Sequence, residues 1–408
     1  MYGHKSKKKF LFAMAVMALG MLASCGQEKN TENRETIVPE SISPPKQAKE
    51  NHETEIPLET EDNTQDNLQT DAFKEMFGQD CISGQTFEVE LSEYEGKVYF
   101  VPLEPSEENG GFRMQIIQEG EVLSEITGYV PESLAGEAFT SLDAVSFYDI
   151  NYDGHTDIVL VETYGSTCFA AVYYGYYNDY GEYGISVGFM VQERLSESIS
   201  ARLEEITVSK IRNLFGGGKK NGEFADYREA YDAVSSLFAL EAGEESGFNL
   251  INVDGDAIPE LITGHTGYYV SMYTYDNGSI YLLMDHWAYG AMGNAGYEYA
   301  SGKNSLRNYN TDYAGAVLYT TYMAVGSGHT IEIVAEIKEV NFDDANGNGA
   351  LDEEEYDSVG NYGVTYINGK EAAYEECEVY DMGPYEYITP SMSLEELREK
   401  LNEGHLDK

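Results

Sequence analysis

Basic residues are scarce in this chain. Only 25 Lys and Arg stand against 72 Asp and Glu in 408 residues, which leaves a formal charge of -47 at pH 7. A chain of this charge repels phosphate backbones and anionic lipid headgroups, which argues against nucleic acid as a partner. Acidity keeps a folded protein soluble at some cost in self-repulsion, and bound divalent cations would relieve that repulsion locally.

Cysteine and recognisable catalytic patterns are also rare. Four cysteines occur, and none has the CxxC spacing of a zinc or redox site: Cys25, Cys81, Cys168 and Cys377. The sequence leaves the pairing of the last three open, and we expect them to be mostly small buried hydrophobes. No HExxH is present. The GxSxG pattern at Gly184-Ile185-Ser186-Val187-Gly188 lies in an expected strand rather than a strand-turn-helix, so we interpret it as chance.

The N-terminus has the features of an export signal. Lys5, Lys7, Lys8 and Lys9 precede the apolar run FLFAMAVMALGML, which is too short for a membrane span. The following Leu22-Ala23-Ser24-Cys25-Gly26 resembles the bacterial lipobox. We therefore expect residues 1–24 to be a lipoprotein signal peptide, with Cys25 lipidated and holding the chain on a membrane. The alternative is an ordinary signal peptide with a chance cysteine.

Residues 25–71 are polar, with several prolines and almost no aromatic residue. They cannot bury enough apolar surface to offset chain entropy, so they predict a disordered tether. The 42% hydrophobic content still suffices for real cores in the rest of the chain.

The rest of the chain predicts an α+β fold, strand-rich, with two related antiparallel-sheet domains and a few helices. We place one domain at 72–215, a Gly/Lys linker at 216–222 and a second domain at 223–408. Helices are expected at 199–214, at 224–240, and from Leu394 onward, where Ser393 and Glu396 form a capping box. Expected strands are 87–91, 98–101, 112–117, 144–147, 158–163, 169–177, 185–191, 260–263, 268–275, 280–284, 315–324, 330–340 and 363–367.

Two acidic loops have the same layout in the two halves. Each follows an apolar strand and leads into another, which makes an internal duplication plausible. The first loop offers oxygens at Asp149, Asn151, Asp153 and Asp157, with Gly154 at the turn, and the second offers Asn252, Asp254, Asp256 and Glu260, with Ala257 where glycine is expected. Calcium takes six to eight such oxygens at roughly 2.3 to 2.6 Å, so both loops are candidate calcium sites.

A third loop matches the EF-hand pattern D-x-[DN]-x-[DN]-G-x5-E. Its candidate ligands are Asp344, Asn346, Asn348, Asp352 and Glu355, with Gly349 at the turn. The residues before it look like strand, so we expect an EF-hand-like loop outside a helix-loop-helix pair. For all three loops the alternative is a hydrated turn, because Asp, Asn and Gly favour turns without any metal.

The first two loops resemble the calcium loops of FG-GAP or VCBS-type repeats, and the whole chain resembles exported lipoproteins of Gram-positive bacteria that carry such repeats. The match covers about a dozen residues per loop. The resemblance implies calcium coordination; it does not imply the β-propeller of FG-GAP proteins, since two copies are too few and helices intervene.

These features predict a membrane-anchored, extracytoplasmic lipoprotein with calcium as its cofactor, acting as a non-enzymatic surface binding or adhesion module. Exposed members of a Tyr-rich set would bind a glycan or a protein: Tyr173, Tyr174, Tyr176, Tyr177, Tyr180, Tyr183, Trp287 and Tyr289. The alternative is a secreted hydrolase acting on cell-wall or other polysaccharide. A solute-capture lipoprotein is disfavoured because strands and helices do not alternate. The ligand and the oligomeric state stay open.

Overall fold

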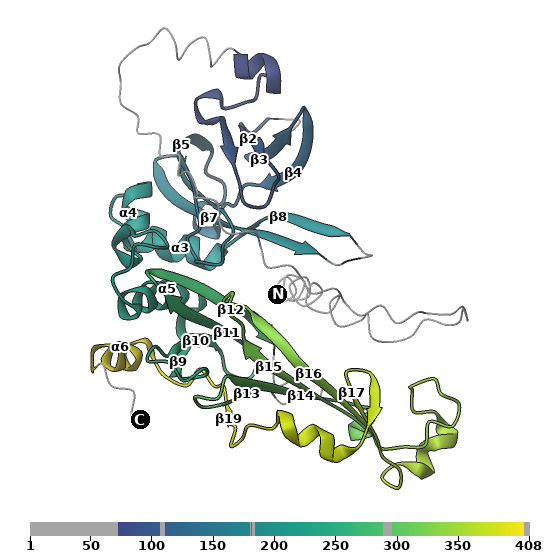
Figure 1. Cartoon of the computed structure of the whole chain (residues 1–408). Coiled ribbons are helices and arrows are strands. Elements are labelled where there is room, and N and C mark those ends of the chain that lie inside the picture. The colour runs from purple at the N-terminus through teal and green to yellow at the C-terminus, as the bar shows by residue number, and fades with distance from the viewer. Residues whose placement is uncertain (1–71, 107–110, 180, 182–183, 289–295, 404–408) are drawn as a thin grey trace, which may run out of the picture. The chain divides into compact units, whose positions relative to one another are not determined.

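Antiparallel strands make up most of the structure, a computed structural model that describes residues 72–106, 111–179, 181, 184–288 and 296–403. All of these residues lie in one unit, Lys46–Lys408. The α+β, strand-rich fold expected from the sequence is confirmed (Figure 1). The predicted signal peptide, Cys25 and the tether lie outside the described residues.

Within the described residues, three sheets have four strands in sequential order and a fourth sheet has seven. The first sheet contains β1 (Phe87–Glu90), β2 (Lys97–Leu103), β3 (Arg113–Gln118) and β4 (Glu121–Thr127). The second contains β5 (Phe139–Tyr148), β6 (Asp157–Tyr164), β7 (Thr167–Asp179) and β8 (Ile185–Val191). The third contains β9 (Gly247–Ile251), β10 (Glu260–His265), β11 (Tyr269–Asp276) and β12 (Ser279–Ala288).

The seven-stranded sheet has the order β18-β17-β16-β15-β14-β13-β19. Its strands are β13 (Tyr297–Ala300), β14 (Ser305–Asp312), β15 (Val317–Val325), β16 (Ile331–Val340), β17 (Val364–Ile367), β18 (Lys370–Ala372) and β19 (Glu386–Tyr387). The α-helices are α3 (Glu193–Arg202), α4 (Val208–Asn213), α5 (Tyr227–Ala242) and α6 (Leu394–Glu403). The 3-10 helices are η2 (Ser83–Gln85), η3 (Glu132–Leu134), η5 (Gly216–Gly218), η6 (Gly243–Glu245), η7 (Tyr313–Gly315), η8 (Glu353–Ser358) and η9 (Tyr374–Tyr380).

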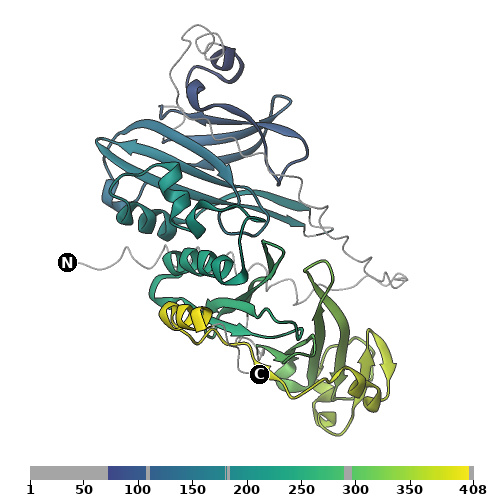
Figure 2. The same ribbon diagram turned by 60° about the vertical axis from the view of Figure 1, so that its left-hand side comes forward.

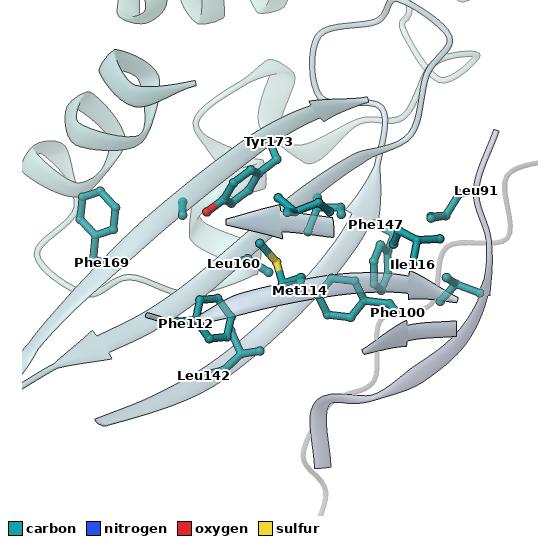
Figure 3. Close-up of a cluster of buried hydrophobic side chains, with 14 of the residues drawn as sticks. Leu91, Phe100, Phe112, Met114, Ile116, Leu142, Phe147, Leu160, Phe169 and Tyr173 are labelled. Carbon is teal, nitrogen blue, oxygen red and sulfur yellow. The ribbon is translucent and has the colours of Figure 1, made fainter. Parts of the chain in front are cut away.

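The first two sheets pack face to face around one apolar core. Phe100 of β2 and Met114 of β3 meet Phe147 of β5 and Leu160 of β6, and all four are buried (Figure 3). Strand β6 is buried on both sides, because its alternate residue Val159 points the other way, toward helices α3 and α4. Its continuous apolar run, which the sequence shows, is what a strand covered on both faces requires.

Helix α5 has two apolar faces. Asp226 caps its N-terminus by accepting from the backbone N–H groups of Arg228 and Glu229. One face enters what we call the second core, which α5 forms with β9, β10, β12, α6 and the loop between β5 and β6: Tyr152, Phe224, Ala230, Tyr231, Ala233, Val234, Phe238, Phe248, Leu250, Leu261, Ile280, Leu397 and Leu401. The other face places Leu237 and Leu240 against α3. The sequence spaces Tyr227, Tyr231, Val234 and Phe238 by four, three and four, which predicts one apolar face. The last three are buried in the second core, and Tyr227 is half-buried against it.

Helix α6 lies beside α5 (Figure 2), where Arg398 Nε donates to Asp232 at 2.7 Å. The expected capping box is present: Ser393 Oγ accepts from Glu396 N–H at 3.2 Å, and Glu396 accepts from Ser393 N–H at 2.7 Å. The predicted single helix at 199–214 is wrong in two respects, because the first helix already begins at Glu193 and the segment is divided into two helices. The chain leaves α3 at Leu203, which is extended, and Thr207 caps a separate α4 through Lys210 N–H.

Cys81, Cys168 and Cys377 are free thiols. Cys81 is 1% exposed in a small core, as expected of a small hydrophobe, whereas the other two are half-buried. In the predicted linker, Asn221 exchanges two hydrogen bonds with the backbone of Ile280.

Candidate metal-binding loops

The first two candidate loops occupy equivalent places in two sheets. Loop 1 (residues 149–157) joins β5 to β6, and loop 2 (residues 252–260) joins β9 to β10, so each connects the first two strands of a four-stranded sheet. In both, the last acid is the first residue of the second strand: Asp157 pairs with Tyr148, and Glu260 with Ile251. The repeated layout seen in the sequence thus coincides with a repeated strand order.

Three hydrogen bonds recur in both loops and in loop 3 (residues 344–355), although the last acid is the ninth residue of loops 1 and 2 and the twelfth of loop 3. The N–H of the second residue donates to the last acid: Ile150 to Asp157 at 2.7 Å, Val253 to Glu260 at 2.7 Å and Ala345 to Glu355 at 2.9 Å. Counted from the first residue of each loop, the side chain of the third residue accepts from the backbone N–H of the fifth; the accepting residues are Asn151, Asp254 and Asn346. The side chain of the fifth residue accepts from the backbone N–H of the seventh; here the accepting residues are Asp153, Asp256 and Asn348. All three loops therefore share one backbone frame.

The fourth residue of each loop has a left-handed backbone conformation: φ is 61° at Tyr152, 88° at Gly255 and 71° at Gly347. Glycine adopts this conformation at little cost, whereas a bulky side chain strains it. Tyr152 is therefore the unusual member.

Loops 1 and 3 also share the environment of their first acid. Asp149 accepts from Asp153 N–H at 3.1 Å and from Gly154 N–H at 3.0 Å, and Asp344 accepts from Asn348 and Gly349 N–H at 3.1 and 2.9 Å. The carboxylate thus sits at the centre of the turn, where a cation could replace part of its hydrogen bonding.

Loop 2 departs from this arrangement. Its first residue, Asn252, accepts from Gly255 N–H at 2.7 Å and donates its own amide to the carbonyl of Asp256. Its main-chain oxygens are also engaged, because Gly302 N–H donates to the Asn252 carbonyl and Asn304 N–H to that of Val253. The substitution of Ala257 for glycine coincides with a loop that is packed against the turn between β13 and β14.

The carboxyl groups of loop 1 are held in an unfavourable environment. Asp157 is fully buried, while Asp149 and Asp153 are half-buried. Burial raises the pKa of Asp149 to about 8, and the charge of Asp153 adds to the rise. Burial, followed by the charges of Asp153 and Asp149, raises the pKa of Asp157 well above its ordinary value. In loop 2, burial raises the pKa of Glu260 to about 8. Burial thus disfavours the charged forms of these groups, and backbone hydrogen bonds offset only part of the cost.

Loop 3 runs from β16 into the 3-10 helix η8, so it lies outside a helix-loop-helix pair, as the sequence indicated. Glu355 ties its two ends together by accepting from Ala345 N–H with one oxygen and from Asp352 N–H with the other. Asp352 accepts from the side-chain amides of Asn346 and Asn348 at 2.7 and 2.8 Å. Every predicted ligand of this loop is therefore in one hydrogen-bonded cluster.

Within the described ranges, no three side chains of His, Cys, Asp or Glu are gathered as a group that could hold a metal ion. The acids alone do not form a ready-made cage. Calcium also uses Asn and main-chain oxygens, and Asn supplies four of the thirteen candidate ligands in these loops.

Two side chains that sequence reasoning missed hold loop 1 from outside. Glu93, which follows β1 and is 5% exposed, accepts from Thr156 N–H at 2.7 Å, and its Oε1 lies 3.5 Å from His155 Nδ1. Ser92 Oγ accepts from Thr156 N–H at 2.7 Å, and Ser92 N–H donates to Thr156 Oγ1 at 3.1 Å. Because these partners are separated by more than sixty positions, no local sequence signal could have indicated them.

The remaining candidates fall mainly in strands. Ser186 of the GxSxG match lies in β8, opposite Asn178, and not at a strand-turn-helix. Of the Tyr-rich set, Tyr173 is buried, Tyr177 is 44% exposed, and Trp287 packs on Tyr297 with ring centres 5.3 Å apart. Tyr174 and Tyr176 are half-buried, and Tyr180, Tyr183 and Tyr289 lie outside the described residues.

No family model, curated protein or solved structure matches this chain. In the part of the chain that the structure describes, no helix has both the length and the apolar character needed to cross a membrane.

Proposed function

We propose that this chain is an exported lipoprotein, anchored to a membrane through lipid on Cys25, whose folded part binds calcium in loops 1 and 3 and acts as a non-enzymatic binding module. The observation that carries the calcium proposal is the common frame of these two loops, which share the hydrogen bonding of the first acid and place oxygens at alternate positions. Calcium is the hard cation that suits such a flexible set of oxygens.

Electrostatics in loop 1 supports the same proposal. Burial raises the pKa of Asp149, Asp153 and Asp157, and the charge of Asp153 raises that of Asp149 and Asp157 further, so the charged loop is costly without a cation. Loop 2 is a weaker candidate because neighbouring backbone N–H groups use two of its carbonyls.

The binding role rests on exposed aromatic and aliphatic side chains. Near loop 3 and after it, seven large apolar residues are exposed: Tyr356, Val359, Tyr362, Tyr374, Val379, Met382 and Tyr387. Exposed tyrosines offer an apolar ring with a polar tip, which suits glycan or protein ligands. A screen of the folded part on glycan arrays and polysaccharide substrates tests this role. Turnover that is lost on mutating a single acid would instead support a hydrolase.

Thermal unfolding of the soluble part with calcium and with chelator tests the calcium proposal. At a calcium concentration about a hundred times the dissociation constant, one occupied site adds roughly 2.7 kcal/mol to the free energy of unfolding. The double variant Asp149→Asn, Asp153→Asn should lose the gain in the free energy of unfolding that comes from calcium in loop 1. The double variant Asp344→Asn, Glu355→Gln should lose the gain that comes from loop 3. Glu371→Gln, an exposed acid in β18, is the matched control. Equal melting temperatures in calcium and chelator would refute the proposal.

A further inference from the structure

Tyr152 belongs to loop 1 by sequence and to the second core by packing. Its side chain is 5% exposed and lies in the same cluster as Tyr231 and Phe248. Its ring meets that of Phe224 edge to face, with centres 5.6 Å apart and planes at 66°. The loop between β5 and β6 therefore inserts an aromatic ring into a core that is built by residues beyond 223.

To make this insertion, the backbone of Tyr152 adopts a strained left-handed conformation. Loops 2 and 3 have glycine at the same position, Gly255 and Gly347. Such a conformation persists at a bulky residue only where surrounding contacts enforce it. Two contacts do so here: the packing of the ring and the hydrogen bonds from Asp153 and Gly154 N–H to Asp149, which close the turn around it.

We infer that Tyr152 transmits calcium occupancy of loop 1 to the second core, so that calcium orders α5 and β9 as well as the loop itself. The inference rests on the proposed calcium binding. Asp149 and Asp153 flank Tyr152 in the turn, so an ion that draws their oxygens together holds the turn closed and the ring in place. Without the ion, nothing joins these oxygens, so the turn opens more readily and the ring is free to leave Phe224.

The variant Tyr152→Gly separates calcium binding in loop 1 from its transmission to the second core. Glycine suits the left-handed position and leaves the ligands of loop 1 intact, but it removes the ring. The fold has other contacts on the far side of α5, since Ser198 Oγ donates to the Leu240 carbonyl at 3.2 Å and Arg194 to that of Ala242 at 2.7 Å. We therefore expect the variant to fold and to bind calcium.

Amide hydrogen exchange with calcium and with chelator tests the inference. In the unaltered protein, calcium at about a hundred times the dissociation constant should slow exchange up to about a hundredfold, both in 149–157 and in 224–251. In Tyr152→Gly the slowing should persist in 149–157 and fall below about threefold in 224–251. Tyr152→Phe, which keeps the ring, should behave like the unaltered protein.

The outcomes are distinguishable. No calcium effect in 149–157 of the unaltered protein would overturn the calcium proposal for loop 1 together with this inference. Slowing that is confined to 149–157, or equal slowing of 224–251 with and without the ring, would overturn the inference alone. If Tyr152→Gly does not fold, Phe224→Leu changes the other side of the contact, and it should reduce the calcium effect in 224–251 while leaving that in 149–157 unchanged.

Discussion

A carboxyl group lies inside the apolar core between the first two sheets. Glu162, in the middle of β6, is fully buried and accepts from the Tyr164 hydroxyl at 2.8 Å, while its Oε1 has no hydrogen-bond partner among the described residues. Burial raises its pKa to about 8, an effect that the Tyr164 hydrogen bond partly offsets. Near neutral pH the group therefore holds its proton in the folded state and loses it on unfolding.

This difference predicts a fall in stability with rising pH. Between the ordinary value of 4.5 and the raised value of about 8, the folded state binds one more proton than the unfolded state. The free energy of unfolding should then decrease by up to about 1.4 kcal/mol per pH unit from this group. Glu162→Gln keeps an acceptor for Tyr164, and its urea unfolding should lose that part of the slope between pH 5 and pH 8. Identical slopes in the two proteins would contradict the prediction.

At the level of elements, helix α6 depends on a single polar cap at its N-terminus. Ser393 and Glu396 satisfy each other's backbone N–H groups, and the helix places Leu397 and Leu401 in the second core. The cap thus fixes where the helix begins and which of its residues are buried.

Ser393→Ala should lower the free energy of unfolding by about 1 kcal/mol, because one backbone N–H at the helix start loses its acceptor. The midpoint of urea unfolding measures the change. Ser393→Asp restores an acceptor and should recover most of the loss. An alanine variant with an unchanged midpoint would show that solvent replaces the cap without cost.

The elements that were predictable are those with local signals. The apolar runs of β6 and β7 can be recognised in the sequence, as can the four-three-four spacing of apolar residues in α5. Strand β14 was missed because Ser305–Asp312 is largely polar, and its extended form comes from pairing with β13 and β15. The ligand spacing indicated the shared layout of loops 1 and 2, whereas the insertion of Tyr152 depends on a core formed more than seventy residues later.

For the whole molecule, the formal charge of -47 opposes folding. Repulsion among so many carboxylates weakens the compact state relative to the expanded one, and salt shortens its range to about 10 Å at 0.1 M. The melting temperature in chelator should therefore rise by a few degrees between about 10 mM and 0.1 M sodium chloride. A calcium titration at constant ionic strength separates this screening from specific binding. A melting temperature that falls with added salt would contradict the prediction.

The free thiols of Cys81, Cys168 and Cys377 have a practical consequence. Since no covalent cross-link joins the described sheets, their assembly needs neither an oxidant nor a disulfide isomerase. The folded part should reach its native state in a reducing cytoplasm as readily as outside the cell, so cytoplasmic expression without the first 71 residues is a direct route to material for the experiments above.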